Sequence, residues 1–274
     1  MDFKEKLDLV PWASRGRRTA ISDLASSVVP IGTSENVIKG DLDSYVELQS
    51  EDHESKMLEI LGTAFQAAPG KLLTCWHVVE ELHANLDNTF FLAWTELHGV
   101  PGIRPYPLAA VMRYYDIRFD DGGPGIDCGL LICPPARQHE APYLVPPISW
   151  ADSTNVGVGD RVLIGGYPLG KEIFFANDTN RGLVQPSFFE GIVSAIIPAL
   201  SAGETRLFQI SSVSLRGMSG GVVCLPDSGR VIGMITSGVA SDNVDLPITY
   251  AIPSEVLEPF VDAVSFNTKS GKWD

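Results

Sequence analysis

Residues 216–223 combine one serine with three glycines in a pattern that suits acyl-transfer chemistry. The segment reads Arg-Gly-Met-Ser-Gly-Gly-Val-Val, so Ser219 lies among glycines just before an apolar run. Glycine has no Cβ and adopts positive φ readily, so backbone N–H groups here can point into a small concavity. Such a concavity binds the oxyanion of a tetrahedral acyl intermediate. We therefore predict that Ser219 is a nucleophile and that the N–H groups of Gly217 and Ser219 hold the oxyanion.

Two other interpretations of this segment exist. The pattern G-x-S-x-G also occurs at the nucleophile elbow of α/β-hydrolases, and a Gly-rich hairpin with an incidental serine has the same composition. An elbow serine is followed in the chain by its histidine. All five histidines precede Ser219, namely His53, His77, His83, His98 and His139. A nucleophile elbow at Ser219 would therefore have no histidine base. The catalytic residues must follow one another along the chain as His, Asp, Ser or as Asp, His, Ser.

Among these histidines, His77 follows directly on a predicted strand. Residues 60–65 and 71–76 are apolar and flank a turn at residues 68–70, which indicates two paired strands. Residues 78–82 then resemble a helical turn. A strand end and a helix can together hold an imidazole rigidly, so His77 is the candidate base. We interpret the other four histidines as ordinary core or surface residues.

The candidate carboxylate is Asp127, which lies at the start of the apolar run 126–133. A carboxylate at that place would be largely buried, which is costly unless it is hydrogen-bonded or paired. The Nδ1–H group of a histidine would supply such a partner. Asp120 and Asp121 lie in a segment with glycines and a proline, and we interpret them as turn residues.

The composition describes an acidic protein with a substantial core. The chain has 274 residues, of which 45% are hydrophobic and 20% charged. Its net charge of −14 argues against a nucleic acid or an anionic membrane as the main partner. The first residues contain no apolar stretch typical of a secretory signal, and no apolar run approaches the length of a membrane span.

The four cysteines, Cys75, Cys128, Cys133 and Cys224, all lie in apolar runs. We predict buried free thiols, which are typical of a reducing compartment and hence of a cytoplasmic protein. No histidine or cysteine cluster has the spacing of a zinc site. We therefore expect no metal and no cofactor.

Turn signals and short apolar runs predict an all-β protein with one C-terminal helix. Besides the runs already named, strands are expected at residues 28–31, 89–94, 107–115, 160–170, 188–196, 206–210, 221–225, 230–235 and 248–252, and a helix at 253–264. Residues 34–57 are acidic and predict a solvated loop, and a Pro-rich break at 134–151 suggests a linker. We expect an N-terminal arm (1–27), a first barrel (28–140), a second barrel (141–252), and a helix with a tail (253–274).

Three blocks of the sequence resemble the catalytic blocks of trypsin-like (chymotrypsin-fold) serine peptidases. They are Thr-Cys-Trp-His-Val-Val at 74–79, Ile-Asp-Cys-Gly-Leu-Leu at 126–131 and Gly-Met-Ser-Gly-Gly at 217–221. Shorter matches at 159–170, 191–196, 231–234 and 250–253 are similar to the HtrA/DegP-like branch of that family. The resemblance covers residues 28 to about 265.

This resemblance implies two six-stranded antiparallel β-barrels with a catalytic triad in the cleft between them. His77 would be general base and then general acid, Asp127 would orient it, and Ser219 would attack the scissile carbonyl. Thr236 matches a family position that hydrogen-bonds near the buried aspartate. The implied activity is that of a serine endopeptidase acting on protein or peptide substrates.

The same resemblance assigns the pocket for the substrate's P1 side chain to Val213, Ser214, Leu215, Thr236, Ser237, Gly238 and Ile248. None of these residues is charged, so a P1 lysine or arginine would bring an unpaired cation into the pocket. We expect small or apolar P1 residues.

Two departures from the family pattern bear on how the protein is controlled. No PDZ domain follows the helix in this sequence, so we expect no peptide sensing through one. Met218 stands where digestive trypsins have an aspartate, so their switch, in which a new N-terminal ammonium pairs with that carboxylate, is not expected. We hypothesise that residues 211–218 are instead ordered by substrate, by oligomerisation or by an activating protein partner.

Two alternative functions stay open at this point. A catalytically silent binding module can have the same fold, because the presence of motifs does not prove that their groups are aligned. Another serine hydrolase, such as an esterase, is disfavoured by the chain order of His77, Asp127 and Ser219.

Overall fold

A computed structural model of the chain describes residues 19–33, 59–80, 89–97, 100–114, 126–133, 145–168, 185–198, 205–241, 244–267 and 272–273. Several features named above lie outside the described residues. They are His53, His83, His98, His139, Asp120, Asp121, the acidic segment 34–57 and part of the linker.

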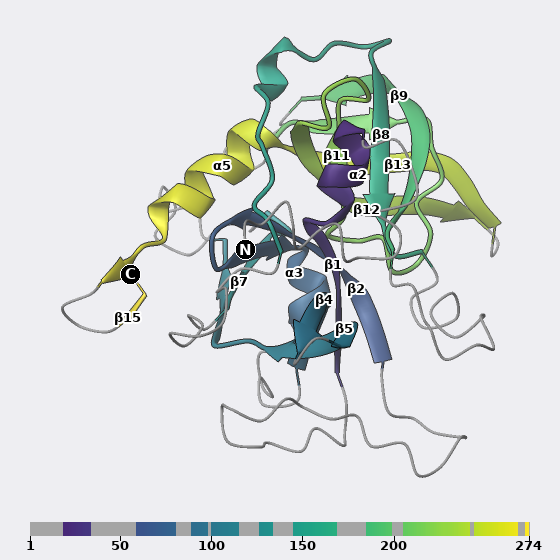
Figure 1. The fold of residues 1–274 in the computed structure, drawn as a ribbon. Helices are drawn as coiled ribbons and strands as arrows, with labels where there is room; N and C mark the ends of the chain where they lie inside the picture. Colours follow the sequence, from purple (N-terminus) through teal and green to yellow (C-terminus); the bar gives the residue numbers. More distant parts are fainter. Residues whose placement is uncertain are drawn as a thin grey trace.

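The first half of the chain forms a sheet of seven antiparallel strands, in the order β5-β4-β1-β2-β3-β7-β6 (Figure 1, purple to teal). Their bounds are β1 (Val28–Thr33), β2 (Glu59–Ala68), β3 (Lys71–Thr74), β4 (Thr89–Leu97), β5 (Val100–Pro107), β6 (Ala110–Arg113) and β7 (Gly129–Ile132). The β2–β3 hairpin turns at residues 68–70 as predicted, and Gly70 has a φ of 75°.

The second half forms a closed barrel of six strands in the order β10-β13-β12-β11-β8-β9. Their bounds are β8 (Arg161–Gly166), β9 (Ser187–Ile197), β10 (Leu207–Ile210), β11 (Val222–Cys224), β12 (Val231–Ser241) and β13 (Val244–Pro253). The β11–β12 hairpin confirms the turn predicted between residues 225 and 230.

Short helices flank the sheets. They are α2 (Ala20–Ala25), α3 (Trp76–Val79), the 3-10 turn η3 (Ser153–Asn155) and α5 (Ser254–Ala263), followed by the strand pair β14 (Phe266–Asn267) and β15 (Lys272–Trp273). Thr19 and Ser22 form a reciprocal capping box at the start of α2. This helix lies within the segment that the sequence predicts as an arm.

The predicted fold class is confirmed: two antiparallel barrel-like sheets and a C-terminal helix. The first sheet differs in having seven described strands instead of six, because β5 was not predicted. Pro101, Pro105 and Pro107 lie in β5, and proline lacks the N–H that a strand ladder uses. Among the described strands, β5 pairs with β4 alone, and proline is tolerated at such an edge.

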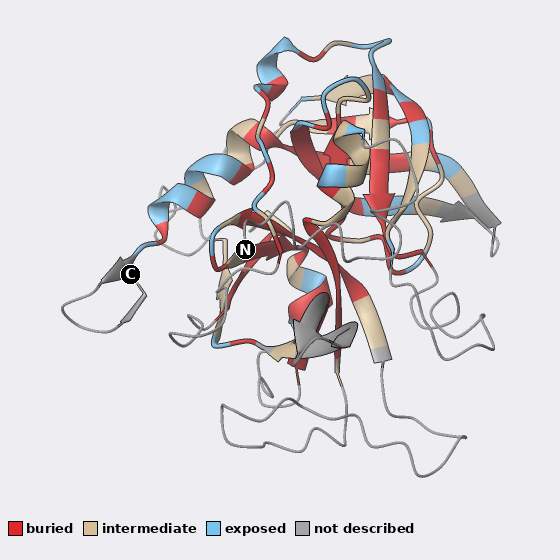
Figure 2. Cartoon of the chain, viewed as in Figure 1, coloured by how far each residue is buried: buried red, intermediate tan, exposed pale blue. Residues whose placement is uncertain are grey.

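Buried side chains form two clusters. Figure 2 shows in red that many of the buried residues lie on the strands of both sheets. The smaller one fills the closed barrel with residues such as Phe208, Ile232 and Met218. The larger one joins Phe65 of the first sheet to Met234 of the second and to Leu257 of α5. Helix α5 therefore packs across both sheets.

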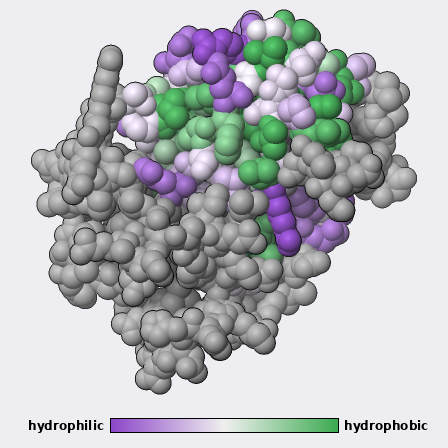
Figure 3. Space-filling view, turned by 90° about the vertical axis from the view of Figure 1, so that its right-hand side faces the viewer, coloured by the Kyte–Doolittle hydropathy of each residue, from purple (hydrophilic) through white to green (hydrophobic). Residues whose placement is uncertain are grey.

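All four cysteines are free and buried, which confirms the predicted thiols. In the described part of the chain, no helix has the length and apolarity needed to cross a membrane. Among the coloured residues of Figure 3, hydrophobic and hydrophilic ones lie side by side. The large hydrophobic side chains that the described residues expose are Val158 and Ile192.

Lys71 of β3 links the first sheet to the end of α5. Its Nζ donates to the carbonyl oxygens of Val261 at 2.6 Å and Val264 at 2.5 Å. These carbonyls are among those that a helix leaves unpaired at its C-terminus, where a cation is also favoured by the helix dipole. Since α5 has no basic residue in its own last turn, the first sheet supplies the cap.

Replacing Lys71 should therefore weaken the whole fold. We expect Lys71→Met to lower the free energy of unfolding by about 1–2 kcal/mol, from the lost hydrogen bonds and helix-end charge. The measurement is urea denaturation followed by circular dichroism. Arg161→Met is the control: it removes an ion pair to Glu190 whose side chains are 70% and 56% exposed, and it should cost less than about 0.5 kcal/mol. Equal losses in the two variants would contradict the prediction.

Candidate active site

The β3–β7 pairing brings His77 and Asp127 together. Thr74, the last residue of β3, is opposite Gly129, the first of β7. The chain then continues from β3 through Cys75, in an extended conformation, into helix α3. The N–H of His77 lies in the first turn of α3, where no intrahelical acceptor exists, and it donates to Asp127 Oδ1 at 3.0 Å.

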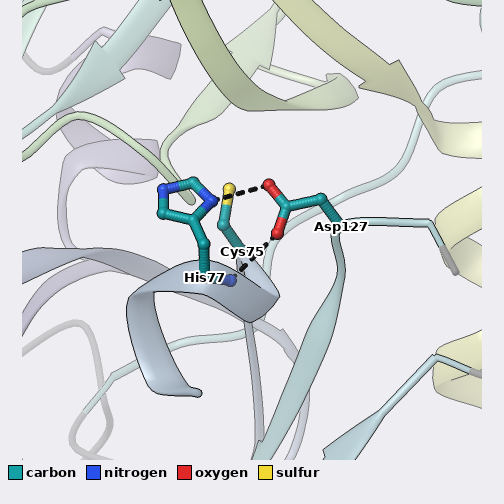
Figure 4. Close-up of side chains that lie close together, drawn as sticks. All are labelled: Cys75, His77 and Asp127. Atoms are coloured by element: carbon teal, nitrogen blue, oxygen red, sulfur yellow. Dashed lines mark hydrogen bonds and ion pairs between the residues drawn. The ribbon is translucent and has the colours of Figure 1, made fainter. Parts of the chain in front are cut away.

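The imidazole of His77 is held by the same carboxylate (Figure 4). Nδ1 lies 2.7 Å from Asp127 Oδ2. A carboxylate can only accept, so Nδ1 carries the proton and donates it into this hydrogen bond. In the neutral ring, Nε2 is then left as an acceptor. The side chain of His77 is half exposed, so Nε2 belongs to a ring that a substrate can approach.

A further contact of this carboxylate comes from the second barrel. The Thr236 hydroxyl on β12 donates to Asp127 Oδ2 at 2.8 Å, as the family resemblance implied. Burial alone would raise the pKa of Asp127. The hydrogen bonds from the His77 side chain and backbone, the His77 charge and the Thr236 hydroxyl outweigh it, so the pKa lies below its ordinary value. Asp127 is therefore a carboxylate at neutral pH.

The pKa of His77 is raised from its ordinary value. The hydrogen bond to Asp127 is the largest cause, partial burial opposes it, and the charges of Asp127 and Glu80 add to the increase. The site therefore stabilises an imidazolium, which is the form that a general base reaches after taking a proton.

Cys75 completes the group of side chains in Figure 4. Its ligand atom and those of His77 and Asp127 lie within 4.8 Å of one another, which is close enough for a metal ion. Metals bind the thiolate, however, and burial raises the pKa of Cys75 well above its ordinary value. The thiol instead donates to the carbonyl oxygen of Ile235 at 3.0 Å. The group fits a protonated thiol beside a His–Asp pair better than a metal site.

The Ser219 loop depends on glycines of positive φ. Gly217 has a φ of 93° and Gly220 a φ of 83°. A Cβ at Gly220 would lie 2.1 Å from the carbonyl oxygen of Thr63, so no other residue fits there without moving the backbone. The sequence-based interpretation of these glycines as conformational requirements is therefore supported.

Contacts with β2 place Ser219 beside the helix that contains His77. The Ser219 carbonyl oxygen accepts from Thr63 N at 2.9 Å. A Cβ on the adjacent Gly62 would lie 3.1 Å from that oxygen and 2.7 Å from the Val78 side chain. The Ser219 loop and helix α3 therefore pack against the same point of β2, and Val78 is the residue after His77.

The N–H groups of Gly217 and Ser219 have no acceptor in the described part of the chain. Gly217 is buried, and buried N–H groups almost always have a partner. Two neighbouring unpaired donors on a loop of positive φ suit an anionic oxygen, as an oxyanion hole requires.

The structure brings several of the predicted pocket residues together. A Cβ at Gly238 would lie 2.9 Å from the Ser214 carbonyl oxygen and 3.8 Å from that of Ile248. Ser237 and Gly238 are exposed, whereas Val213 and Leu215 are partly buried and Leu215 packs against the barrel core. Ser214, Gly238 and Ile248 therefore lie close together. That they form the P1 pocket is a proposal.

Sequence reasoning missed the residues that join the two sheets at this site. Thr63, Thr74 and Tyr167 are buried and hydrogen-bond to one another or to the Ser219 loop. No short motif marks them. The one available signal was a threonine within each of the apolar runs that form β2 and β3.

Two antiparallel barrel-like sheets, one with a His–Asp pair and the other with a glycine-rich serine loop, describe the class of two-barrel serine hydrolases. The chain belongs to the family of the trypsin-like peptidase domain, whose sequence profile matches residues 62–234. This match confirms the predicted class of trypsin-like serine peptidases.

Solved structures of the HtrA-type protease AlgW are similar in fold. The structure with a decapeptide has 20% sequence identity and a TM-score of 0.58, over 89% of this chain and 66% of that chain. A structure with a tripeptide has 19% identity and a TM-score of 0.54, over 89% and 62%. The chain thus spans less than two thirds of these proteins. At such identities the likeness concerns the fold, which is the one that the HtrA-like motifs predicted. No curated protein matches the sequence.

The electrostatics of the pair lead to a pH prediction. In Asp127→Asn, the hydrogen bond to the carboxylate and its charge no longer raise the pKa of His77, and burial outweighs the remaining Glu80 charge, so the pKa should fall below its ordinary value of about 6.5. The measurement is an NMR titration of the His77 ring. Glu80→Gln, which removes the weakest contribution, should change the pKa far less. An unchanged His77 pKa in Asp127→Asn would contradict the assignment.

The same shift affects stability. Because the folded pKa of His77 is above the unfolded one, its protonation stabilises the fold fully below the unfolded pKa, and this contribution is lost as the pH rises through the folded pKa.

Proposed function

We propose that this chain is a serine endopeptidase whose catalytic residues are His77, Asp127 and Ser219. The observation that carries the proposal is the hydrogen bond from His77 Nδ1 to Asp127, which leaves Nε2 as an acceptor on a helix that packs against the same point of β2 as the Ser219 loop. Membership of the trypsin-like peptidase family supports it.

In the proposed reaction, Ser219 Oγ attacks the scissile carbonyl carbon while its proton moves to His77 Nε2. Asp127 stabilises the imidazolium, and the N–H groups of Gly217 and Ser219 hold the oxyanion. His77 then gives the proton to the leaving amine, and an acyl-enzyme on Ser219 remains. Water, deprotonated by His77, attacks this ester, and the carboxylic acid leaves as Ser219 regains its proton.

A peptide substrate of apolar or small P1 residue suits the proposed pocket. The HtrA-type protease structures similar to this chain are of the protease with a decapeptide and with a tripeptide, which supports a peptide as substrate. The pocket assigned to Val213, Ser214, Leu215, Thr236, Ser237, Gly238 and Ile248 contains no charged side chain. A P1 cation would have no counter-charge there.

The proposal includes regulation by a protein partner or by oligomerisation, since unrestricted hydrolysis of cellular proteins is harmful. The loop 211–218 is already held by contacts within the chain, including the hydrogen bond from Thr249 Oγ1 to the Ser212 carbonyl at 2.8 Å. This supports control at the approach of the substrate more than control by ordering of the loop.

Fluorophosphonate labelling tests the proposed function. The reagent forms a bond between Ser219 Oγ and phosphorus, fluoride leaves, and His77 takes the serine proton. We expect one adduct, on Ser219, by intact mass and peptide mapping. Ser219→Ala should give none, and His77→Ala should label at least about 10³-fold more slowly, because the base is lost.

The competing functions give different results in the same assay. A silent binding module would bind peptides without forming the adduct. An esterase would form it and hydrolyse simple esters but leave peptides intact. An enzyme that is switched off would form the adduct after addition of cell lysate but not when purified, which would support regulation by a partner.

Substrate profiling tests the pocket. With peptides that differ only at P1, we expect kcat/KM for alanine, valine or leucine to exceed that for arginine by about 100-fold, because an unpaired buried cation costs several kcal/mol. Val213→Asp should improve cleavage after arginine by supplying a counter-charge, and Val213→Asn is the neutral control. Efficient cleavage after arginine by the unmodified protein would show that the pocket is assigned wrongly.

A further inference from the structure

The side chain of Thr63 connects the two sheets at the base of the Ser219 loop. Thr63 is fully buried on β2 of the first sheet. Its Oγ1 donates to the carbonyl oxygen of Gly217 at 2.7 Å and accepts from Tyr167 N at 2.9 Å. Both partners belong to the second half of the chain, so this one hydroxyl joins the sheets.

The backbone of Thr63 makes two further contacts at the same place. Its N–H donates to Ser219 O at 2.9 Å, and its carbonyl oxygen accepts from Thr74 Oγ1 at 2.7 Å. These groups point to the β3 side of β2, and they are available because β3 ends at Thr74 before it would reach Thr63. The Ser219 loop therefore occupies the position that a further residue of β3 would take.

The hydroxyl of Thr63 fixes one particular peptide plane. In the Gly217–Met218 peptide, the Gly217 carbonyl oxygen accepts a hydrogen bond from Thr63 Oγ1, and the Met218 N–H donates to the Leu215 carbonyl oxygen at 3.0 Å. With both ends of this plane held, and with Gly217 at a φ of 93°, the direction of the Gly217 N–H is set. That N–H is one of the two proposed oxyanion donors.

We propose that Thr63 is a positioning residue for the oxyanion hole, acting through the Gly217 carbonyl. Without its hydroxyl, the Gly217 carbonyl would be a buried acceptor without a partner, and the Gly217–Met218 peptide could rotate to find another one. The Gly217 N–H would then turn away from the reacting oxygen. This inference rests on the proposed peptidase function.

Two substitutions that differ by a single oxygen atom test the proposal. Thr63→Ser keeps the hydroxyl and Thr63→Ala lacks it, while both lack the methyl group. We expect Thr63→Ser to stay within about threefold of the unmodified enzyme. We expect Thr63→Ala to lose about 100-fold in kcat with little change in KM, because loss of one oxyanion donor costs about 10²–10³ in kcat. The fluorophosphonate rate should fall in parallel.

Thr249→Val is a matched control. It removes another buried threonine hydroxyl that holds a carbonyl of the same loop, that of Ser212 at the end far from Ser219. Its melting temperature should fall about as much as that of Thr63→Ala, with kcat within about threefold. A merely structural role for Thr63 would give equal kcat values in the two variants and would overturn the proposal.

The same experiment distinguishes a variant that has lost its fold from one that is folded but has lost activity. Thermal melting identifies unfolded variants. If Thr63→Ala does not fold, Thr63→Val supplies a second variant without the hydroxyl and with more of the native volume. An unmodified enzyme that neither labels nor cleaves, either purified or after addition of cell lysate, would refute the proposed function, and this inference with it. An active enzyme whose Thr63→Ala variant keeps its kcat would refute the inference alone.

Discussion

The site depends on one constraint, which is the fixed position of the Ser219 loop against strand β2. His77 and Asp127 come from the first sheet and Ser219 from the second, so a small slip between the sheets would separate the proposed base from the proposed nucleophile. The hydrogen bond from Thr63 N to Ser219 O sets this position. Close backbone approach makes it possible, since a Cβ at Gly220 or Gly62 would meet neighbouring atoms at less than 3 Å.

Hydrogen bonds and charges then set the protonation states of the residues that this packing brings together. Asp127 is partly buried, and a carboxylate there is stable because the backbone and ring of His77 and the hydroxyl of Thr236 all donate to it. Thr236 comes from the second barrel, so the hydrogen bonding of the His77–Asp127 pair also depends on the relative position of the two sheets. The protonated thiol of Cys75 fills the space beneath the pair without adding a charge.

The sequence predicted the groups that belong to short motifs and failed for those that act across long separations. His77, Asp127 and the glycines around Ser219 each lie in a local pattern whose chemistry can be inferred from neighbours. The partners of the Thr63 hydroxyl are 104 and 154 residues away, so nothing near Thr63 indicates its role. Strand β5 was missed because its prolines oppose a strand locally, and its place at the sheet edge is a tertiary fact.

The buried Met218 explains how the Ser219 loop can keep its conformation without the ion pair between an N-terminal ammonium and an aspartate that digestive trypsins use. Its side chain is wholly buried in the core of the closed barrel, where a carboxylate would need a counter-charge. The loop is held instead by neutral donors, Thr249 at the Ser212 carbonyl and Thr63 at the Gly217 carbonyl. Neutral hydrogen bonds do not depend on a newly formed N-terminus or on the ionisation of a carboxylate. In such a protein, cleavage of the chain is not needed to form the loop.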